Sequence, residues 1–221
     1  MEHPPLLIHI PGIPEYLAYT WLIMGMLIAM AFVVSRGLKP MPAGIQNFFE
    51  IVVDGILKFM EDIIGHNSRQ YLPLIGTLAF FILTSNLMGL IPGFMSPTSD
   101  INTTASCAVI VFVATHYYGV KSHGISYLKH FLGPVLWLAP LMVILEIIGH
   151  LARVLSLSIR LFGNIYGEDL ILLVLVFLVP LLIPLPMMVL AVATSVVQTF
   201  VFVLLSMMYI KLATEEAEEG H

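Results

Sequence analysis

Charged residues are scarce in this sequence, since Asp, Glu, Lys and Arg make up only 10% of its 221 residues. Soluble domains typically carry about a quarter of charged residues. Hydrophobic residues reach 59%, and the mean hydropathy is +0.98. This balance excludes a soluble domain. It predicts an all-α integral membrane protein that crosses the bilayer several times.

Cysteine and the common enzyme motifs are also missing or nearly so. Because Cys107 is the only cysteine, a disulfide framework and a multi-cysteine metal or iron–sulfur site are excluded. The chain contains no Gly-rich phosphate loop, no HExxH zinc pair and no nucleophile elbow. We therefore expect no catalytic site, no cofactor, no metal and no direct nucleotide binding.

The two ends of the chain differ in charge. Residues 1–14 contain no Lys or Arg, which a cleavable signal peptide would need at its start, and we expect the first span to be kept as an anchor. Most of the net charge of −5 comes from the C-terminal TEEAEEGH. We expect residues 215–221 to be a solvated acidic tail, and this charge indicates no nucleic-acid partner.

Long apolar runs predict a single membrane domain, residues 1–221, with about five membrane helices. Three spans are expected at 15–35, 72–91 and 101–118, and two longer helices at 134–179 and 187–214. Residues 41–66 mix apolar and charged side chains at helical spacing. This pattern predicts an amphipathic helix that lies along the membrane interface.

The two last helices are too long to stand upright in a bilayer. A helix over residues 134–179 would be about 69 Å long, against a hydrocarbon core of about 30 Å. We expect both helices to lie strongly tilted or to bend. The available bending positions in the first of them are Pro140, Gly149, Gly163 and Gly167.

Basic residues in the short connections mark one side of the membrane. Arg36 follows the first span, Arg69 precedes the second, and Lys121 and Lys129 follow the third, whereas residues 92–104 contain no Lys or Arg. Basic loops stay in the cytoplasm. We therefore expect the N-terminus outside the cell and the C-terminus in the cytoplasm.

The most unusual stretch, residues 146–169, carries two arginines in an apolar helix. At 100° per residue, a polar stripe forms within about 80° of the helix wheel; it consists of Glu146, His150, Arg153, Arg160 and Asn164. An arginine near the bilayer centre costs roughly 2.5–3.5 kcal/mol on insertion scales. We expect the stripe to face a bundle interior, an aqueous cavity or a partner charge.

The chemistry of Arg160 suggests separation rather than conduction. A guanidinium stays protonated, so it cannot relay protons, but it can block a path of carboxylates and waters. A partner carboxylate at about 4 Å would be attracted by about 4 kcal/mol at a dielectric of 20. Glu146 precedes Arg160, whereas Glu168 and Asp169 follow it. This layout predicts two water-filled half-channels isolated by one fixed charge.

Four stretches resemble subunit a of the F-type ATP synthases: SLSIRLFGNIYGEDLI, VVQTFVFVLLSMMYI, NLMGLIPGF and HYYGVKSHG. The resemblance implies a static subunit of the Fo sector in a bacterial plasma membrane, packed in the bilayer against a rotating ring of c subunits and against b-type subunits of the peripheral stalk. Protons would load and unload the ring carboxylates beside Arg160, which couples proton flow to ATP synthesis. We expect the coupling ion to be the proton rather than sodium.

The resemblance also assigns individual residues. It implies translocation roles for Arg160, Asn164 and Gln198, with Glu146 as the acid of the inner inlet and Asp169 as that of the outer inlet. Further inlet-lining positions are expected at His150, Ser156, Asn86 and Thr194.

Two positions depart from the family pattern. Glu168 precedes the outer acid and, in an unbroken helix, lies about 40° from Glu146, whereas Asp169 lies at about 140°. Either acid could load the outer inlet. Ala191 stands seven residues before Gln198, where some members carry a titratable partner, which must here come from elsewhere or be absent.

Several polar residues have structural alternatives. Arg160 could form an ion pair with Glu146 or Glu168, and Arg153 either reaches the interface or pairs with Glu146. His150 is expected to pack helices rather than carry protons, although imidazole chemistry suits a relay. Asn86 either joins helices or lines an inlet. Interfacial positions are expected for His116, His123 and His130.

Two other functions compete with this interpretation. A haem-binding membrane anchor needs paired histidines on neighbouring helices, and His116 with His150 would have to supply them. A stand-alone ion channel or transporter is disfavoured because the sequence shows no inverted repeat and no series of carboxylates to hand ions along.

Overall fold

A computed structural model describes residues 11–36, 44–65, 68–91, 93–124, 139–178 and 184–215. The regular elements in these residues are all helices, and four are long and apolar enough to cross a membrane; they are α1 (Glu15–Arg36), α4 (Ile101–His123), α6 (Ala139–Leu178) and α7 (Pro184–Glu215). The structure confirms an all-helical membrane protein.

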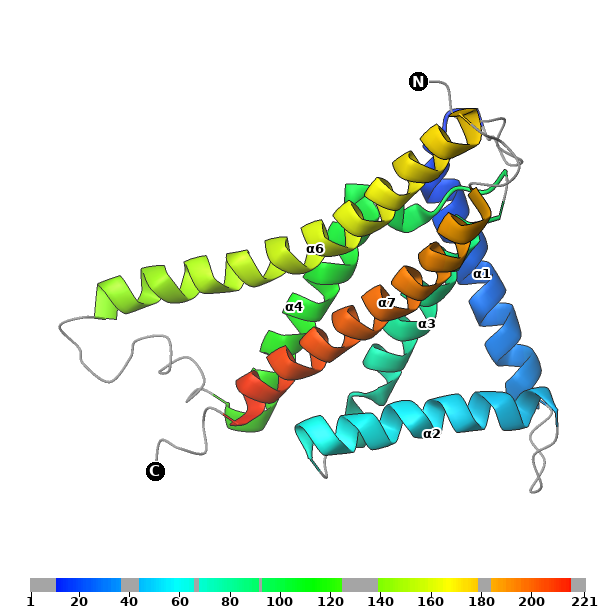
Figure 1. Ribbon diagram of the computed structural model, residues 1–221. Coiled ribbons are helices and arrows are strands. Elements are labelled where there is room, and N and C mark those ends of the chain that lie inside the picture. The colour runs from blue at the N-terminus through cyan, green and yellow to red at the C-terminus, as the bar shows by residue number, and fades with distance from the viewer. Residues whose placement is uncertain are drawn as a thin grey trace.

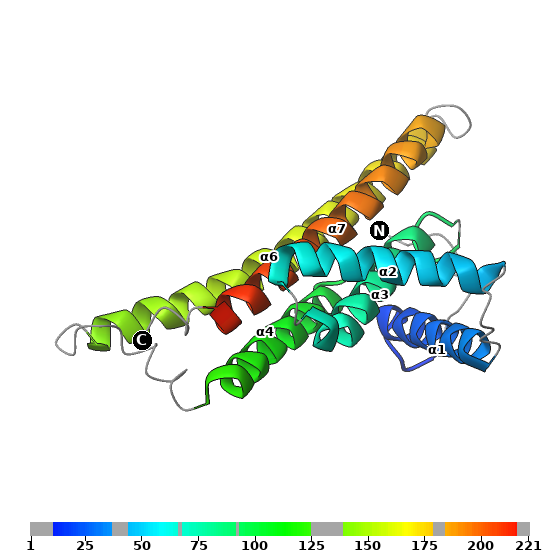
Figure 2. The same ribbon diagram turned by 90° about the horizontal axis from the view of Figure 1, so that it is seen from below.

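Smaller elements complete the chain. Helix α3 (Leu72–Met88) is a shorter apolar helix of about 25 Å at 1.5 Å per residue, and α2 (Ile45–Ile64) is the amphipathic one. Two 3-10 turns, η1 (Ser68–Gln70) and η2 (Pro97–Ser99), precede α3 and α4. The ends of α1, α3, α4, α6 and α7 lie on two opposite sides of the bundle, and α2 lies across one of these sides (Figures 1 and 2).

Helix α6 is unbroken for 40 residues, which corresponds to about 60 Å. The helix passes through Gly149, Gly163 and Gly167 without interruption, and Pro140 lies in its first turn, where the missing N–H is tolerated. Excess length is therefore accommodated without a break: α6 lies obliquely across α4 and curves along its length (Figures 1 and 2). The predicted start of this helix, residues 134–138, lies outside the described residues.

Other boundaries differ from the sequence-based expectation by a few residues. Helix α7 begins at Pro184 rather than at residue 187, because proline is accepted in a first turn. Helix α3 ends at Met88 rather than at residue 91, and α4 continues to His123 rather than to residue 118. Residues 37–43 and 216–221, which include most of the acidic tail, are outside the described part of the chain.

Two apolar clusters hold the helices together. The larger joins α3, α4, α6 and α7 through side chains that include Ile82, Val111, Leu161 and Phe202. The smaller fastens α2 to α3 and α7, and its members include Met60, Ile75, Met207 and Ile210. Lipid is as apolar as these side chains, so the association depends on close packing rather than on a hydrophobic force.

The connection between α3 and α4 is polar and buried. Ser96 is 1% exposed, and its hydroxyl donates to the backbone carbonyl of Ser85 at 2.9 Å. The Tyr19 hydroxyl of α1 donates to the Gly93 carbonyl at 3.2 Å. Close packing at this point depends on Gly89, because a Cβ there would lie 2.7 Å from the Cβ of Ser96.

We expect Gly89→Ala to destabilise the folded chain by about 1–3 kcal/mol, the usual cost of overpacking. The control is Gly76→Ala, because an added Cβ at Gly76 meets no atom within 4 Å. Unfolding can be followed by a thiol-reactive dye, since the single cysteine, Cys107, is buried. Equal melting temperatures for the two variants would contradict the proposed contact.

Candidate functional site

Arg160 lies midway along α6 on an exposed and otherwise apolar surface. Its Nη2 is 3.4 Å from the Ser156 hydroxyl one turn earlier, and Ile159, the preceding residue, is 53% exposed. Among the described residues, no carboxylate lies within ion-pair distance of Arg160. The alternative of a structural ion pair with Glu146 or Glu168 is therefore wrong.

Asn164 and Gln198 meet one turn further along α6. The Asn164 amide donates to the Gln198 carbonyl oxygen at 2.6 Å, and this contact links α6 to α7. Gln198 is only 4% exposed, so the hydrogen bond fixes the two helices beside Arg160. Thr194, one turn before Gln198, donates instead to the Leu190 carbonyl within α7.

On the Glu146 side of Arg160, the polar residues pair with one another. His150 Nε2 lies 3.1 Å from Glu146 Oε1. The guanidinium of Arg153 lies 5.7 Å from the centre of the Tyr209 ring, within the range of a cation–π contact. Arg153 thus packs on α7, and the alternative in which it pairs with Glu146 is not found in the described residues.

Glu168 and Asp169, on the other side of Arg160, have different surroundings. Glu168 is 7% exposed, and its Oε2 is without a hydrogen-bond partner in the described part of the structure. Asp169 lies beside the side chain of Ser99 in η2, whose hydroxyl donates to the Ser96 carbonyl at 2.7 Å. The unbroken helix therefore separates the two neighbouring acids, and Asp169 turns to the polar connection between α3 and α4.

Asn86 belongs to the same polar region. Its carbonyl oxygen accepts from the Thr98 hydroxyl at 2.6 Å, and its amide lies 3.4 Å from the Ser195 carbonyl of α7. Asn86 is 2% exposed and so joins α3, η2 and α7. These contacts support the first of the two alternatives, in which Asn86 joins helices.

The sequence analysis did not predict two of the contacts around these residues, those made by Ser99 and by His116. Ser99 gave no signal, because its contact with Asp169 spans 70 residues and depends on the fold of η2. His116 was expected at the interface, but its ring lies 4.6 Å from that of His150, centre to centre. His123 and His130 have side chains outside the described set.

Comparison with known proteins gives a consistent result. The model of the family described as ATP synthase A chain matches residues 17–211. The chain belongs to the ATP synthase A chain family. It is similar to ATP synthase subunit a of Geotalea uraniireducens strain Rf4, with 53% identity over 94% of this chain and 89% of the relative. ATP synthase subunit a of Geobacter sulfurreducens is 54% identical over 92% of this chain and 89% of its own length. ATP synthase subunit a of Citrifermentans bemidjiense is 49% identical over 98% of this chain and 100% of its own length.

Family membership and geometry both weigh against the haem-anchor alternative. The rings of His116 and His150 are in edge contact at 4.6 Å, which leaves no room for a haem iron between them. Family membership likewise favours a subunit of a larger machine over a stand-alone channel or transporter.

Proposed function

We propose that the chain is the static proton-channel subunit of a bacterial ATP synthase. Two half-channels separated by Arg160 load and unload the carboxylates of a rotating c-subunit ring, and proton flow is thereby coupled to ATP synthesis. Catalysis of ATP formation belongs to other subunits. The family match and the names of the relatives support this assignment.

The observation that carries the proposal is the position of Arg160. Its permanent charge lies midway along a membrane helix, on an open apolar surface, without a carboxylate partner among the described residues. A charge at this depth requires a partner charge or water. A ring of carboxylates that passes this surface meets that requirement, and the Asn164–Gln198 hydrogen bond keeps the surface rigid.

The two acids that we propose for the proton inlets, Glu146 and Asp169, lie on opposite sides of Arg160 along α6. Along a straight helix, Glu146 is about 21 Å before it and Asp169 about 13.5 Å after it. A single water path cannot serve both without passing the guanidinium. We assign Glu146 to the inner inlet, and Asp169, with Ser99 and the Asn86 region, to the outer inlet.

The proposed surroundings follow from this assignment. The chain is a single multi-pass domain of the bacterial plasma membrane, with its N-terminus outside and its C-terminus in the cytoplasm. Its partners are the c-subunit ring, b-type subunits of the peripheral stalk and lipid. Nucleic acid and nucleotide are not ligands of this subunit. The exposed apolar side chains of α1, such as Trp21 and Val33, suit contact with lipid or with apolar partners.

Sided chemical modification tests both the function and the orientation. Inverted vesicles in which this chain is the only subunit a should acidify when ATP is added. In a Cys107→Ala background, Ser156→Cys should lose this pumping within minutes of adding silver ions to the bath, which contacts the inner face. The rate is compared with that of the same vesicles before silver is added.

The matched control is Ile159→Cys, at similar depth but at an apolar position outside the polar stripe of α6, where a thiol away from water should stay unreactive. Inhibition by silver ions that reach only the outer face would mean that the chain has the opposite orientation. A failure of the unmodified chain to support any ATP-driven acidification would remove the proposed function.

A further inference from the structure

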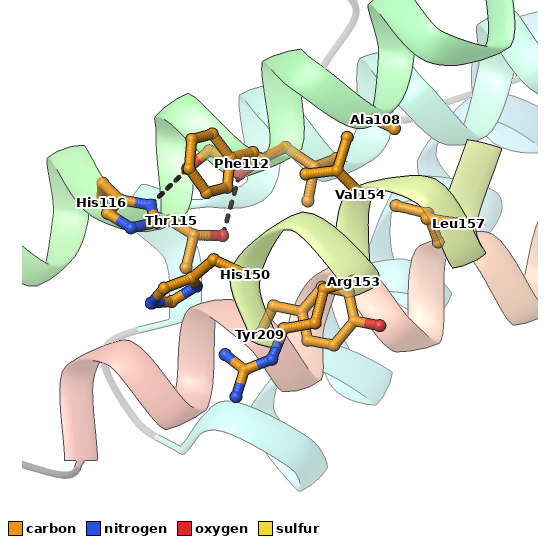
Figure 3. A pocket seen from close by; sticks show the side chains of 10 residues that line it. Ala108, Phe112, Thr115, His116, His150, Arg153, Val154, Leu157 and Tyr209 are labelled. Atoms are coloured by element: carbon orange, nitrogen blue, oxygen red, sulfur yellow. Dashed lines mark hydrogen bonds between the residues drawn. The ribbon is translucent and has the colours of Figure 1, made fainter. Parts of the chain in front are cut away.

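A pocket between α4, α6 and α7 lies on the Glu146 side of Arg160 and contains two histidines from different helices (Figure 3). His116 of α4 and His150 of α6 have ring centres 4.6 Å apart. The space open to the centres of water molecules is about 20 Å³. A water molecule needs roughly 10–15 Å³ by this measure, so the pocket can hold one beside the imidazoles.

His150 makes a contact that suits proton exchange. It is 8% exposed, and its Nε2 lies 3.1 Å from Glu146 Oε1. While Glu146 is ionised, its oxygen can only accept, and Nε2 carries the hydrogen. When Glu146 is protonated, its O–H can donate to Nε2 instead. The same short contact therefore exists in both states, and a proton can cross it in either direction.

His116 has a different hydrogen-bond pattern. Its Nδ1 lies 2.9 Å from the carbonyl oxygen of Phe112. Because a carbonyl only accepts, Nδ1 carries the hydrogen of the neutral ring. His116 thus has one ring nitrogen occupied by its own helix.

The charges around His150 come from three helices. Glu146 and Arg153 are its neighbours on α6, His116 faces it from α4, and Tyr209 lines the same pocket from α7. One carboxylate and one guanidinium balance each other. Two imidazolium rings in contact would repel, so the pair of histidines accommodates one added proton at a time. Within the described residues, no group of His, Cys, Asp and Glu is arranged to hold a metal ion.

We propose that His150 is a proton-relay residue of the inner inlet, an inference that rests on the proposed function. A proton that binds one ring nitrogen forms the imidazolium, and the proton on the other nitrogen leaves, so the neutral ring is restored. Nε2 exchanges its proton with the Glu146 carboxyl group. Water in the pocket gives or takes the proton at Nδ1.

The test uses His150→Ala in inverted vesicles that contain the complete ATP synthase. We expect ATP-driven charge movement to slow several-fold and to recover when imidazole is added to the bath, because the missing ring enlarges the pocket. Pyrazole, a ring of the same size that stays neutral, should not restore the rate. The readout is a potential-sensitive dye, since imidazole is a permeant base and would mask a pH-gradient signal.

A double substitution adds a second, independent measurement. If His150 and Glu146 act in one relay, the double variant Glu146→Gln/His150→Ala should be no slower than the slower single variant. Multiplied effects would mean independent roles and would overturn the relay. Leu151→Ala, at a neighbouring lipid-exposed position, serves as the control and should keep the wild-type rate.

The remaining outcomes separate the relay from the function on which it rests. A His150→Ala variant as fast as wild type would refute the relay and leave the proposed function intact. Recovery with pyrazole as well as imidazole would show that His150 only fills space, and recovery with neither would count against the relay. Absence of charge movement in wild-type vesicles would instead refute the proposed function.

Discussion

Replacement of Arg160 by alanine, or even by lysine, is expected to reduce proton-driven ATP synthesis to the level of vesicles that lack the chain. Lysine keeps the charge, but it is a compact ammonium and lacks the planar fork that binds a carboxylate through two N–H groups. The fold should survive, since Arg160 makes only a 3.4 Å contact with Ser156 among the described side chains. The measurement is synthesis driven by an imposed pH and potential gradient.

The variant and wild-type vesicles must contain equal amounts of assembled complex. Ile159→Ala provides a neighbouring control at an exposed apolar position. Arg160→Ala should in addition leak protons between the inlets, provided that the ring still turns, because the separating charge is gone. Synthesis at a near wild-type rate in Arg160→Lys vesicles would overturn the assigned role.

The second large effect is expected at the outer inlet. Asp169→Asn should lower proton flux several-fold, whereas Glu168→Gln should lower it little. Asp169 lies beside Ser99 in the polar connection between α3 and α4, whereas Glu168 is buried and its Oε2 has no partner in the described structure. Flux is measured as passive proton conduction through the membrane sector after the catalytic sector is removed.

Asp100→Asn is the matched control for this experiment. Asp100 caps α4 by accepting from the Asn102 N–H at 2.8 Å, and asparagine caps equally well, so this neutralisation should leave flux unchanged. The opposite order of effects would assign the outer inlet to Glu168. Only a double variant of Glu168 and Asp169 with normal flux would remove this segment from the proton path.

The sequence predicted those features that depend on local periodicity. Hydropathy located the membrane helices, and the 3.6-residue period placed Arg160 and Asn164 on one face of α6. The bilayer strengthens such inferences, because helices are among the few structures that satisfy the backbone within lipid. Glycines in α6 did not interrupt it, because the helix runs unbroken over its 40 residues and curves gently along its length (Figures 1 and 2).

Contacts between elements that are distant in the sequence could not be predicted from local periodicity. The pairing of Arg153 with Tyr209, of His116 with His150 and of Ser99 with Asp169 depends on how α4, α6, α7 and η2 are placed against one another. Glu146 precedes Arg153 by two turns on the same face of the helix, so it was one of the two partners expected for Arg153. In the structure, the rotation of α6 against α7 turns Arg153 to an aromatic ring instead.

The exposed position of Arg160 also bears on the chain before it joins its complex. A guanidinium that faces lipid near the bilayer centre costs roughly 2.5–3.5 kcal/mol, which corresponds to about a hundredfold in an equilibrium constant. On the proposed function, a newly inserted, unassembled subunit carries this penalty until a carboxylate of the ring relieves it. The charge proposed to separate the two inlets therefore also disfavours the unassembled subunit and favours assembly.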